Sequence, residues 1–344
     1  MRSFRKIKIK MRTESLDRLI RAYLSGNAPS RTSVCENEEV CKFTASKVAN
    51  ALIESGFMCE KLFSLDGKER PRLHLFLRDS VRILLIDFSS PRFKMSIIAN
   101  DSSVIFESSY NYDSSITFDD NINIFLSRCG LSVKRSGYGF SAISVLYADQ
   151  EQKSHIEVNP HQACLPSIKQ KDIISRAVYE ILRKTPETHL TVSDAICEAM
   201  RYKVNGIDVL KGASYIFVGS RLLAFHSHTD SSKTVCSPEK LLSNDEKHIL
   251  EQPHLSSKED IDMLFIKLCE FMDAAFSPSV VILESDIHTP DDITARKITR
   301  TFALSGKNIP LINVRTSDSK DSLHIHGIFR STVLSLIERY ISTA

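Results

Sequence analysis

Residues 30–57 read SRTSVCENEEVCKFTASKVANALIESGF, and this stretch decides the fold of the N-terminal part of the chain. Ser30 is a favourable N-cap for a short helix in which Val34 faces inward. A longer helix is predicted over residues 41–55, and its apolar stripe consists of Val48, Ala49, Leu52 and Ile53. Gly56 suits the position just after that helix, because glycine readily adopts the left-handed conformation found there.

The flanks of this stretch supply one more helix and a hairpin. On the N-terminal side, a helix is predicted from Ser15 to about Gly26, with helical spacing of Leu16, Leu19, Ile20 and Leu24. On the C-terminal side, a strand-like run over 57–65 precedes an Asp-Gly pair at 66–67 and the alternating residues Leu73, Leu75 and Leu77. Strand, Asp-Gly turn and strand indicate a β-hairpin. Three short helices followed by a hairpin predict a winged helix-turn-helix domain over residues 1–78.

Charge is unevenly distributed between this head and the rest of the chain. Residues 1–78 contain 16 Lys and Arg against 9 Asp and Glu, whereas the remainder contains 29 basic and 33 acidic residues. A basic head on a mildly acidic body indicates that the head meets a polyanion. A slightly basic, solvated small domain would carry the same charge, so the distribution alone leaves that alternative open.

The polar residues of the third predicted helix are of the types that read DNA. Short hydroxyls and amides reach base edges, and flanking cations reach phosphates. The candidates on this helix are Lys42, Thr44, Ser46, Lys47 and Asn50. Arg31 is placed to clamp a phosphate, and the hairpin tip is placed to enter a minor groove through Lys68, Arg70 and Arg72. We therefore expect double-stranded DNA as a partner.

The body, residues 79–344, has α/β order with inserted antiparallel hairpins. It opens with three strand-like runs typical of a β-meander, at 82–88, 93–99 and 104–110. Further strands are predicted at 140–147, 190–193, 213–218, 222–225, 279–284 and 309–314, and helices at 120–128, 171–184, 195–202, 258–276, 290–305 and 326–342. Two meander-containing lobes indicate the two-lobed, RNase H-like fold of the actin and hexokinase group. The predicted lobes are 79–190 with the C-terminal helix 326–344, and 191–325.

The head resembles the DNA-binding domain of the ROK family (repressors, open reading frames and sugar kinases). The family pattern runs approximately S-R-x-x-L-A-x-x-T-G-L-S-x-x-T-V-S-x-x-V-x-x-L-x-x-x-G. Ser30, Arg31, Thr44, Ser46, Leu52 and Gly56 match it directly. Glu38 and Glu39 replace the Thr-Gly pair of the turn, and Cys41 replaces the serine N-cap. These acidic residues lie close to the expected phosphate surface and weaken the expected DNA binding.

The body resembles the same family along its length. Residues 85–91 lie where the family has its D-x-G-G-T phosphate loop, residues 191–196 where it has E-N-D-A-N, and residues 215–219 where it has a second glycine-rich loop. Residues 280–283 resemble the strand before a Gly-Gly loop, and Gly327 matches a glycine at the start of the last helix. The resemblance therefore covers nearly the whole chain, although these motifs survive only in part.

The losses concern groups that a sugar kinase needs. Ser89, Ser90 and Pro91 replace the Gly-Gly-Thr of the first loop, although glycines there let backbone N–H groups approach phosphate oxygens. The second loop keeps only Gly219, and Glu284-Ser285 replaces the later glycine pair. Asp194 matches the family's catalytic base, and Ser193 stands where a sugar-binding asparagine is expected. We expect no phosphoryl transfer, an N-capping role for Asp194, and at most ligand contacts from Asp194 and Ser193.

Neither a cofactor nor a metal ion is expected. The Cys cluster of the family's zinc site is missing, and His226, His228 and Cys236 are better explained as part of an exposed loop than as a remnant of that site. The eight cysteines form no CxxC pair, and no apolar run approaches the ~18 residues of a membrane span. The N-terminus has no apolar segment typical of a secretory signal. We therefore expect a cytoplasmic protein with reduced thiols and no membrane association.

The resemblance implies a homodimeric transcriptional regulator, most simply a repressor, that binds a pseudo-palindromic operator and responds to a sugar or related small molecule. Two alternatives remain open at this point. One is a divergent sugar kinase with an appended DNA-binding head, which Asp194 alone supports. The other is a dimerisation scaffold whose head no longer binds DNA, which the acidic turn favours.

Overall fold

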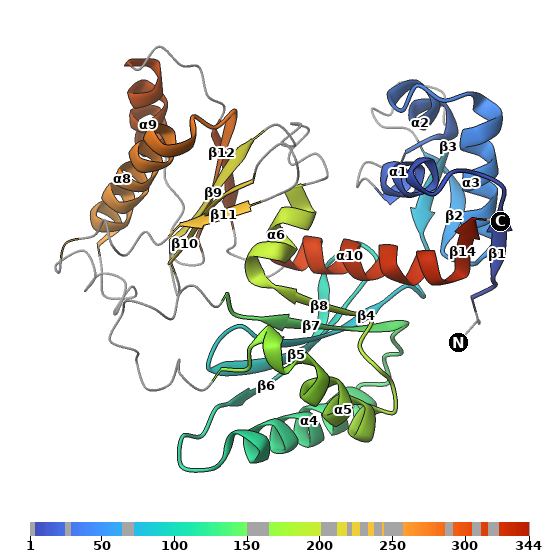
Figure 1. The fold of residues 1–344 in the computed structure, drawn as a ribbon, viewed down its shortest axis with the longest axis horizontal. Helices are drawn as coiled ribbons and strands as arrows, with labels where there is room; N and C mark the ends of the chain where they lie inside the picture. Colours follow the sequence, from blue (N-terminus) through green and yellow to red (C-terminus); the bar gives the residue numbers. More distant parts are fainter. Residues whose placement is uncertain are drawn as a thin grey trace. The chain divides into compact units, whose positions relative to one another are not determined.

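The structure is a computed structural model (Figure 1) that describes residues 4–24, 29–63, 72–149, 165–200, 212–218, 222–227, 233–236, 243, 257–285, 292–304, 311–315 and 323–343. The chain divides into two compact units. Unit 1 consists of Met1–Tyr147, Ile168–Leu190 and Ile328–Ala344, and unit 2 of Ala148–Ser167 and Thr191–Gly327. The head thus shares a unit with the first sheet, and residues 148–167, which we expected in the first lobe, fall in unit 2.

The head contains three helices, as expected from its apolar spacing. They are α1 (Thr13–Leu24), α2 (Arg31–Asn37) and α3 (Lys42–Glu54). Leu16, Leu19, Ile20 and Leu24 of α1 are all buried. Ser30 is the N-cap of α2 and forms a capping box with Ser33, in which each hydroxyl accepts from the other's backbone N–H at 3.0 and 2.9 Å.

A two-stranded antiparallel hairpin follows the helices. It consists of β2 (Met58–Phe63) and β3 (Arg72–Leu77), in register with Met58 opposite Leu77 and Leu62 opposite Leu73. Leu75 is buried in the head, while Leu73 near the open end of the hairpin is exposed. The Asp-Gly turn predicted at residues 66–67 lies outside the described residues.

The main sheet of unit 1 has five strands in the order β6-β5-β4-β7-β8. Its strands are β4 (Ile83–Phe88), β5 (Arg92–Ile98), β6 (Val104–Asn111), β7 (Ala142–Tyr147) and β8 (Thr188–Thr191). β4, β5 and β6 form the predicted antiparallel meander, and β7 pairs parallel with β4.

Two helices cover one face of this sheet. α4 (Phe118–Arg135) packs against β5, β6 and α5 (Lys171–Leu182), and a short 3-10 helix, η3 (Ile168–Gln170), precedes α5. Phe125 of α4 lies edge-on to Phe88 and Phe93, with ring centroids 5.4 and 5.5 Å apart. These three buried rings pack α4 against the sheet, and aromatic pairs favour edge-to-face arrangements of this kind.

The sheet of unit 2 repeats the topology of the first. Its strands are β9 (Ala213–Val218), β10 (Leu222–Ser227), β11 (Lys233–Cys236), β12 (Val280–Ser285) and β13 (Leu311–Arg315). Their order is β11-β10-β9-β12-β13, with β9, β10 and β11 antiparallel and with β12 parallel to both β9 and β13. A meander extended by parallel strands thus occurs twice in one chain, as the RNase H-like interpretation predicted.

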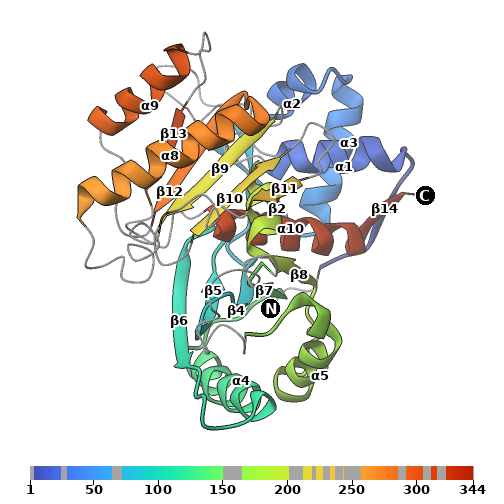
Figure 2. The ribbon, with the colours of Figure 1, turned by 60° about the vertical axis from the view of Figure 1, so that its left-hand side comes forward.

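The described residues of unit 2 include the helices α6 (Val192–Met200), α8 (Lys258–Phe276) and α9 (Asp292–Leu304). Figure 2 shows α8 lying along the sheet at β9 and β10, and its buried side includes Leu264, Phe265 and Leu268. None of the helices in the described ranges combines the length and the apolar character needed to cross a membrane.

The two ends of the chain pair with each other. The last helix, α10 (Leu323–Tyr340), is followed by a strand, β14 (Ile341–Thr343), which pairs in parallel with β1 (Ile7–Ile9) (Figure 1). The prediction of a helix continuing to residue 344 was therefore wrong. Residues Ile341–Thr343 are held extended by β1, which lies more than 330 positions away in the sequence. Local periodicity does not reveal a partner at that distance.

Candidate nucleic-acid interface

Helix α3 separates buried from accessible residues around its axis. Its buried residues are Ala45, Val48, Ala49, Ala51 and Leu52. Phe43, Lys47 and Asn50 are spaced i, i+4 and i+7 and therefore lie along one other side of the helix. The buried stripe holds α3 in the head and leaves this second side available.

The residues of α3 that we predicted as DNA contacts differ in the exposure of their side chains. Lys42 and Asn50 are exposed, whereas Ser46 and Lys47 are half-buried. Thr44 is also half-buried, and its hydroxyl lies 3.0 Å from the Sγ of Cys41, the N-cap residue. Lys42, Lys47 and Asn50 thus combine long or exposed side chains with a position on the accessible part of the helix.

Arg31 lies in an ion pair within the head. Its Nε is 2.7 Å from Oε1 of Glu60 on β2, and both side chains are partly buried. The partner carboxylate offsets the charge that we expected to clamp a phosphate. A phosphate would have to bind the remaining guanidinium N–H groups in competition with Glu60, so Arg31 is a weaker candidate than the sequence indicated.

The acidic turn between α2 and α3 is partly neutralised. Oε2 of Glu38 lies 3.4 Å from Nε of Arg18 on α1. Glu39 has a φ of 51°, in the left-handed region, at the position where the family pattern has glycine. The turn therefore keeps the backbone conformation of the family motif. Glu39 adopts this left-handed conformation at a cost in conformational energy, which glycine would not incur.

The hairpin contributes one described candidate, Arg72, which is exposed at the start of β3. Lys68 and Arg70 lie outside the described residues. The exposed hydrophobic residues of the head were not expected: Phe43 is 77% exposed, and the cross-strand partners Leu62 and Leu73 are 71% and 52% exposed. Phe43 is not part of the predicted apolar stripe, and its helical spacing in the sequence already sets it off from that stripe.

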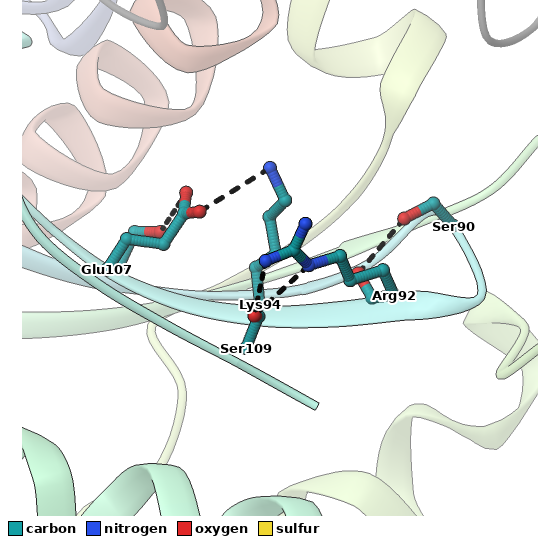
Figure 3. A network of polar contacts seen from close by, with 6 residues as sticks. Ser90, Arg92, Lys94, Glu107 and Ser109 are labelled. Carbon is teal, nitrogen blue, oxygen red and sulfur yellow. Dashed lines mark hydrogen bonds and ion pairs between the residues drawn. The ribbon is translucent and has the colours of Figure 1, made fainter. Parts of the chain in front are cut away.

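In unit 1, the loop at residues 89–91 is closed by its own polar groups. Oδ1 of Asp87 accepts from the backbone N–H of Ser89 at 2.8 Å, and the Ser90 hydroxyl donates to the Arg92 carbonyl at 3.0 Å. Figure 3 shows the network continuing along β5 and β6, from Arg92 to the Ser109 hydroxyl and from Lys94 to Glu107. The N–H of Ser89 therefore already has an acceptor at the place where a kinase loop would offer it to a phosphate.

In unit 2, Ser193 and Asp194 serve the start of α6. The N-cap is Thr191, whose hydroxyl donates to Oδ2 of Asp194 at 2.7 Å and accepts from the Asp194 N–H at 3.3 Å. Asp194 therefore closes a capping box as the third helical residue, and the expectation that it is the N-cap was wrong. Ser193 is fully buried and donates its N–H at 3.1 Å and its hydroxyl to the carboxylate of Asp149.

The other altered motif of unit 2 is also internal. Glu284 on β12 is fully buried, and the hydroxyl of Tyr215 on β9 donates to its Oε2 at 2.6 Å. His226 on β10 is buried, with Nδ1 3.1 Å from the Ser214 hydroxyl, and its ring stacks on Phe276. The described residues contain no His, Cys, Asp and Glu grouping that would hold a metal ion. The candidate ligand His228 lies outside them, and His226 is not in the exposed loop that we expected.

Solved structures share this fold. A structure described as a ROK family transcriptional regulator, a homologue of the E. coli MLC protein, aligns over 95% of this chain and 99% of its own length, with 11% identity and a TM-score of 0.55. An inorganic polyphosphate/ATP-glucomannokinase from Arthrobacter sp. strain KM aligns over 74% of this chain and 99% of its own, with 14% identity and a TM-score of 0.47. A ROK hexokinase from Thermus thermophilus aligns over 75% and 99%, with 11% identity and a TM-score of 0.44.

No protein-family model and no curated protein sequence matches the chain. The first of the solved structures aligns with nearly the whole chain, head included. The chain therefore has the fold of a ROK family transcriptional regulator, and the predicted resemblance to ROK-type proteins is confirmed at the level of the fold.

Proposed function

We propose that the protein is a ROK-type transcriptional regulator that binds double-stranded DNA through a winged helix-turn-helix head and has no kinase activity. One observation carries the proposal. The chain has the fold of a ROK regulator over nearly its full length, and within that fold α3 follows α2, precedes a hairpin and has an accessible side with Lys47 and Asn50. In a winged helix-turn-helix, a helix in this position enters the major groove.

The side chains of α3 fit distinct parts of a duplex. The exposed amide of Asn50 is suited to a bidentate contact with adenine, and the exposed ring of Phe43 to a thymine methyl group. Lys42 and Lys47 supply phosphate contacts, with Thr44 and Ser46 as further polar contacts. The hairpin acts as the wing and brings Arg72, with Lys68 and Arg70, to the minor groove.

A regulator of this kind acts as a homodimer on a pseudo-palindromic operator in the cytoplasm. A sugar or related small molecule is the effector that the fold favours. Such a ligand changes DNA affinity only if it binds one arrangement of the two heads more tightly than the other.

The absence of kinase activity is argued from two altered motifs. The first phosphate loop has serines in place of glycines, and the Ser89 N–H is bound to Asp87. Asp194, the counterpart of the catalytic base, is hydrogen-bonded in a capping box, and Ser193 is bound to Asp149. Because phosphoryl transfer depends on positioned phosphates and charges, we expect no ATP consumption above background with hexoses or amino sugars. Sugar-dependent ATP turnover by the purified chain would restore the kinase alternative.

The test of the DNA-binding role is the variant Asn50→Ala in the full chain. Loss of a bidentate base contact should weaken binding to the specific site by about 1–3 kcal/mol, roughly 5- to 150-fold, and leave binding to random duplex nearly unchanged. Asn123→Ala is the matched control, because Asn123 is an exposed asparagine on helix α4. Equal specific affinities for Asn50→Ala and Asn123→Ala would remove α3 from the recognition surface.

A further inference from the structure

The positive charge of the head is concentrated in its first residues. Residues 1–12 contain six Lys and Arg and no acidic residue, whereas residues 13–78 contain ten basic and nine acidic residues. The helices and hairpin, taken without residues 1–12, are therefore almost neutral. If the head binds a polyanion, most of its net charge for doing so lies outside the helix-turn-helix itself.

The arginines of α1 and α2 are engaged in ion pairs. Arg18 pairs with Glu38, Arg21 with Asp17 and Arg31 with Glu60. The cations of the N-terminal arm, defined here as residues 4–12, differ from them. Arg5, Lys6, Lys8, Lys10 and Arg12 are all exposed, and no acidic side chain in the described parts of the chain forms an ion pair with them.

The arm presents its lysines in a regular array. Ile9 is 2% exposed and Ile7 is half-buried, while Lys6, Lys8 and Lys10 alternate with them and are exposed. Side chains two residues apart in an extended strand point to the same side and are separated by roughly 6.6 Å. Lys8 lies within β1 on the side opposite Ile9, and the alternation places Lys6 and Lys10, which flank the strand, in one row with it.

The arm is anchored beside α3. β1 pairs with β14, and the ring of Phe4 stacks on Phe57 with centroids 4.1 Å apart. The arm also meets α3 directly, because Lys47 Nζ donates to the Lys10 carbonyl at 3.0 Å. A row of cations held in this way retains little of the conformational freedom of a disordered tail, so less ordering entropy is lost when it binds.

We propose that the N-terminal arm is a second DNA-contacting element, in which Lys6, Lys8 and Lys10 bind backbone phosphates next to the site read by α3. The proposal rests on the DNA-binding role of the head and assigns to the arm most of its sequence-independent affinity. Phosphate contacts carry no base information, so the arm strengthens binding to every duplex and leaves discrimination to α3.

The test compares wild type with the triple variant Lys6→Ala/Lys8→Ala/Lys10→Ala in the full chain. Binding to a random duplex is measured by fluorescence anisotropy across a salt series. Each phosphate contact contributes about 0.9 to the slope of log affinity against log salt, so the variant's slope should be shallower by about 2.7. The ratio of specific to random affinity should stay the same.

The control is Arg128→Ala/Lys134→Ala/Arg135→Ala on α4, which removes three exposed cations and so changes net charge equally. We expect it to keep the wild-type slope. If the arm variant has the slope of wild type and of this control, while wild type binds DNA, the arm proposal is overturned and the proposed function stands. If wild type binds no duplex at any salt concentration, both are overturned. Circular dichroism of the variants verifies that the fold is retained.

Discussion

Gly327 occupies a position in α10 where no other residue fits. The family resemblance predicted Gly327 at the start of the last helix, but α10 begins at Leu323 and Gly327 lies in its second turn. A Cβ atom at this position would lie 1.6 Å from the carbonyl oxygen of Ala195 and 3.0 Å from the backbone nitrogen of Ala199, both on α6. The backbone of α6 therefore approaches the first part of α10, which belongs to unit 2 up to Gly327, closely at this glycine.

The substitution Gly327→Ala should destabilise the protein strongly. A methyl group needs about 3.4 Å or more from its neighbours, and both obstructing atoms belong to backbone, so α6 and α10 have to separate. Overpacking of this kind costs about 3 kcal/mol or more, and the higher helix propensity of alanine returns about 1. The net loss of about 2 kcal/mol or more corresponds to a fall in Tm of roughly 4–8 °C for a unit of this size.

The matched control is Gly130→Ala on α4. There the added Cβ meets the Cδ2 of Leu182 at 3.1 Å, and this atom is the end of a flexible side chain. We expect a change between neutral and about 1 kcal/mol stabilising, because helix propensity favours alanine. Thermal unfolding followed by circular dichroism measures both variants. A Tm for Gly327→Ala within about 1 °C of the Gly130→Ala value would refute the close helix contact, because an effect of about 2 kcal/mol or more shifts Tm by more than that.

Three further predictions concern the head. Burial raises the pKa of Tyr23 to about 12. The stability that the neutral Tyr23 side chain contributes is therefore complete below the ordinary tyrosine pKa of about 10 and is lost as pH rises towards about 12. Tyr23→Phe removes the hydrogen bond to Ala45, so it should cost about 1 kcal/mol at neutral pH and flatten the alkaline fall in Tm. Glu39→Val should unfold more easily than Glu39→Gly by about 1–2 kcal/mol in urea titrations, because a β-branched residue resists a positive φ. Hydrogen bonding to Thr44 lowers the pKa of the exposed Cys41 thiol, whereas burial raises the pKa of the Cys269 thiol. Peptide mass spectrometry should therefore find iodoacetamide on Cys41 before Cys269, and the adduct on Cys41 should weaken DNA binding. Equal labelling rates of the two cysteines would contradict this prediction.

The regular elements were predictable because local patterns encode them. The strand at 213–218 and the helix at 258–276 have the bounds expected from apolar spacing and turn residues. Ser30 has the geometry that its N-capping role requires. These features depend on residues within a few positions of one another, so their sequence signals are complete.

Features that depend on distant partners were not predictable. The pairing of β1 with β14 joins the two ends of the chain, and neither three-residue strand has a periodic signal of its own. Arg31 was expected to be free because nothing in its own segment shows that Glu60 lies beside it. The charge of Asp194 suggested an N-cap, whereas the three-residue spacing from Thr191 to Asp194 is the pattern of a capping box with Thr191 as its N-cap.

The proposed function requires a head that binds specific DNA. Its most direct test is the affinity of the purified full-length protein for duplex from its own promoter-proximal region, measured against a random duplex of equal length across a salt series. We expect the promoter complex to be tighter than the random one by about 10³-fold or more, with both affinities falling steeply as salt rises. Equal affinity for the two duplexes at every salt concentration would contradict it.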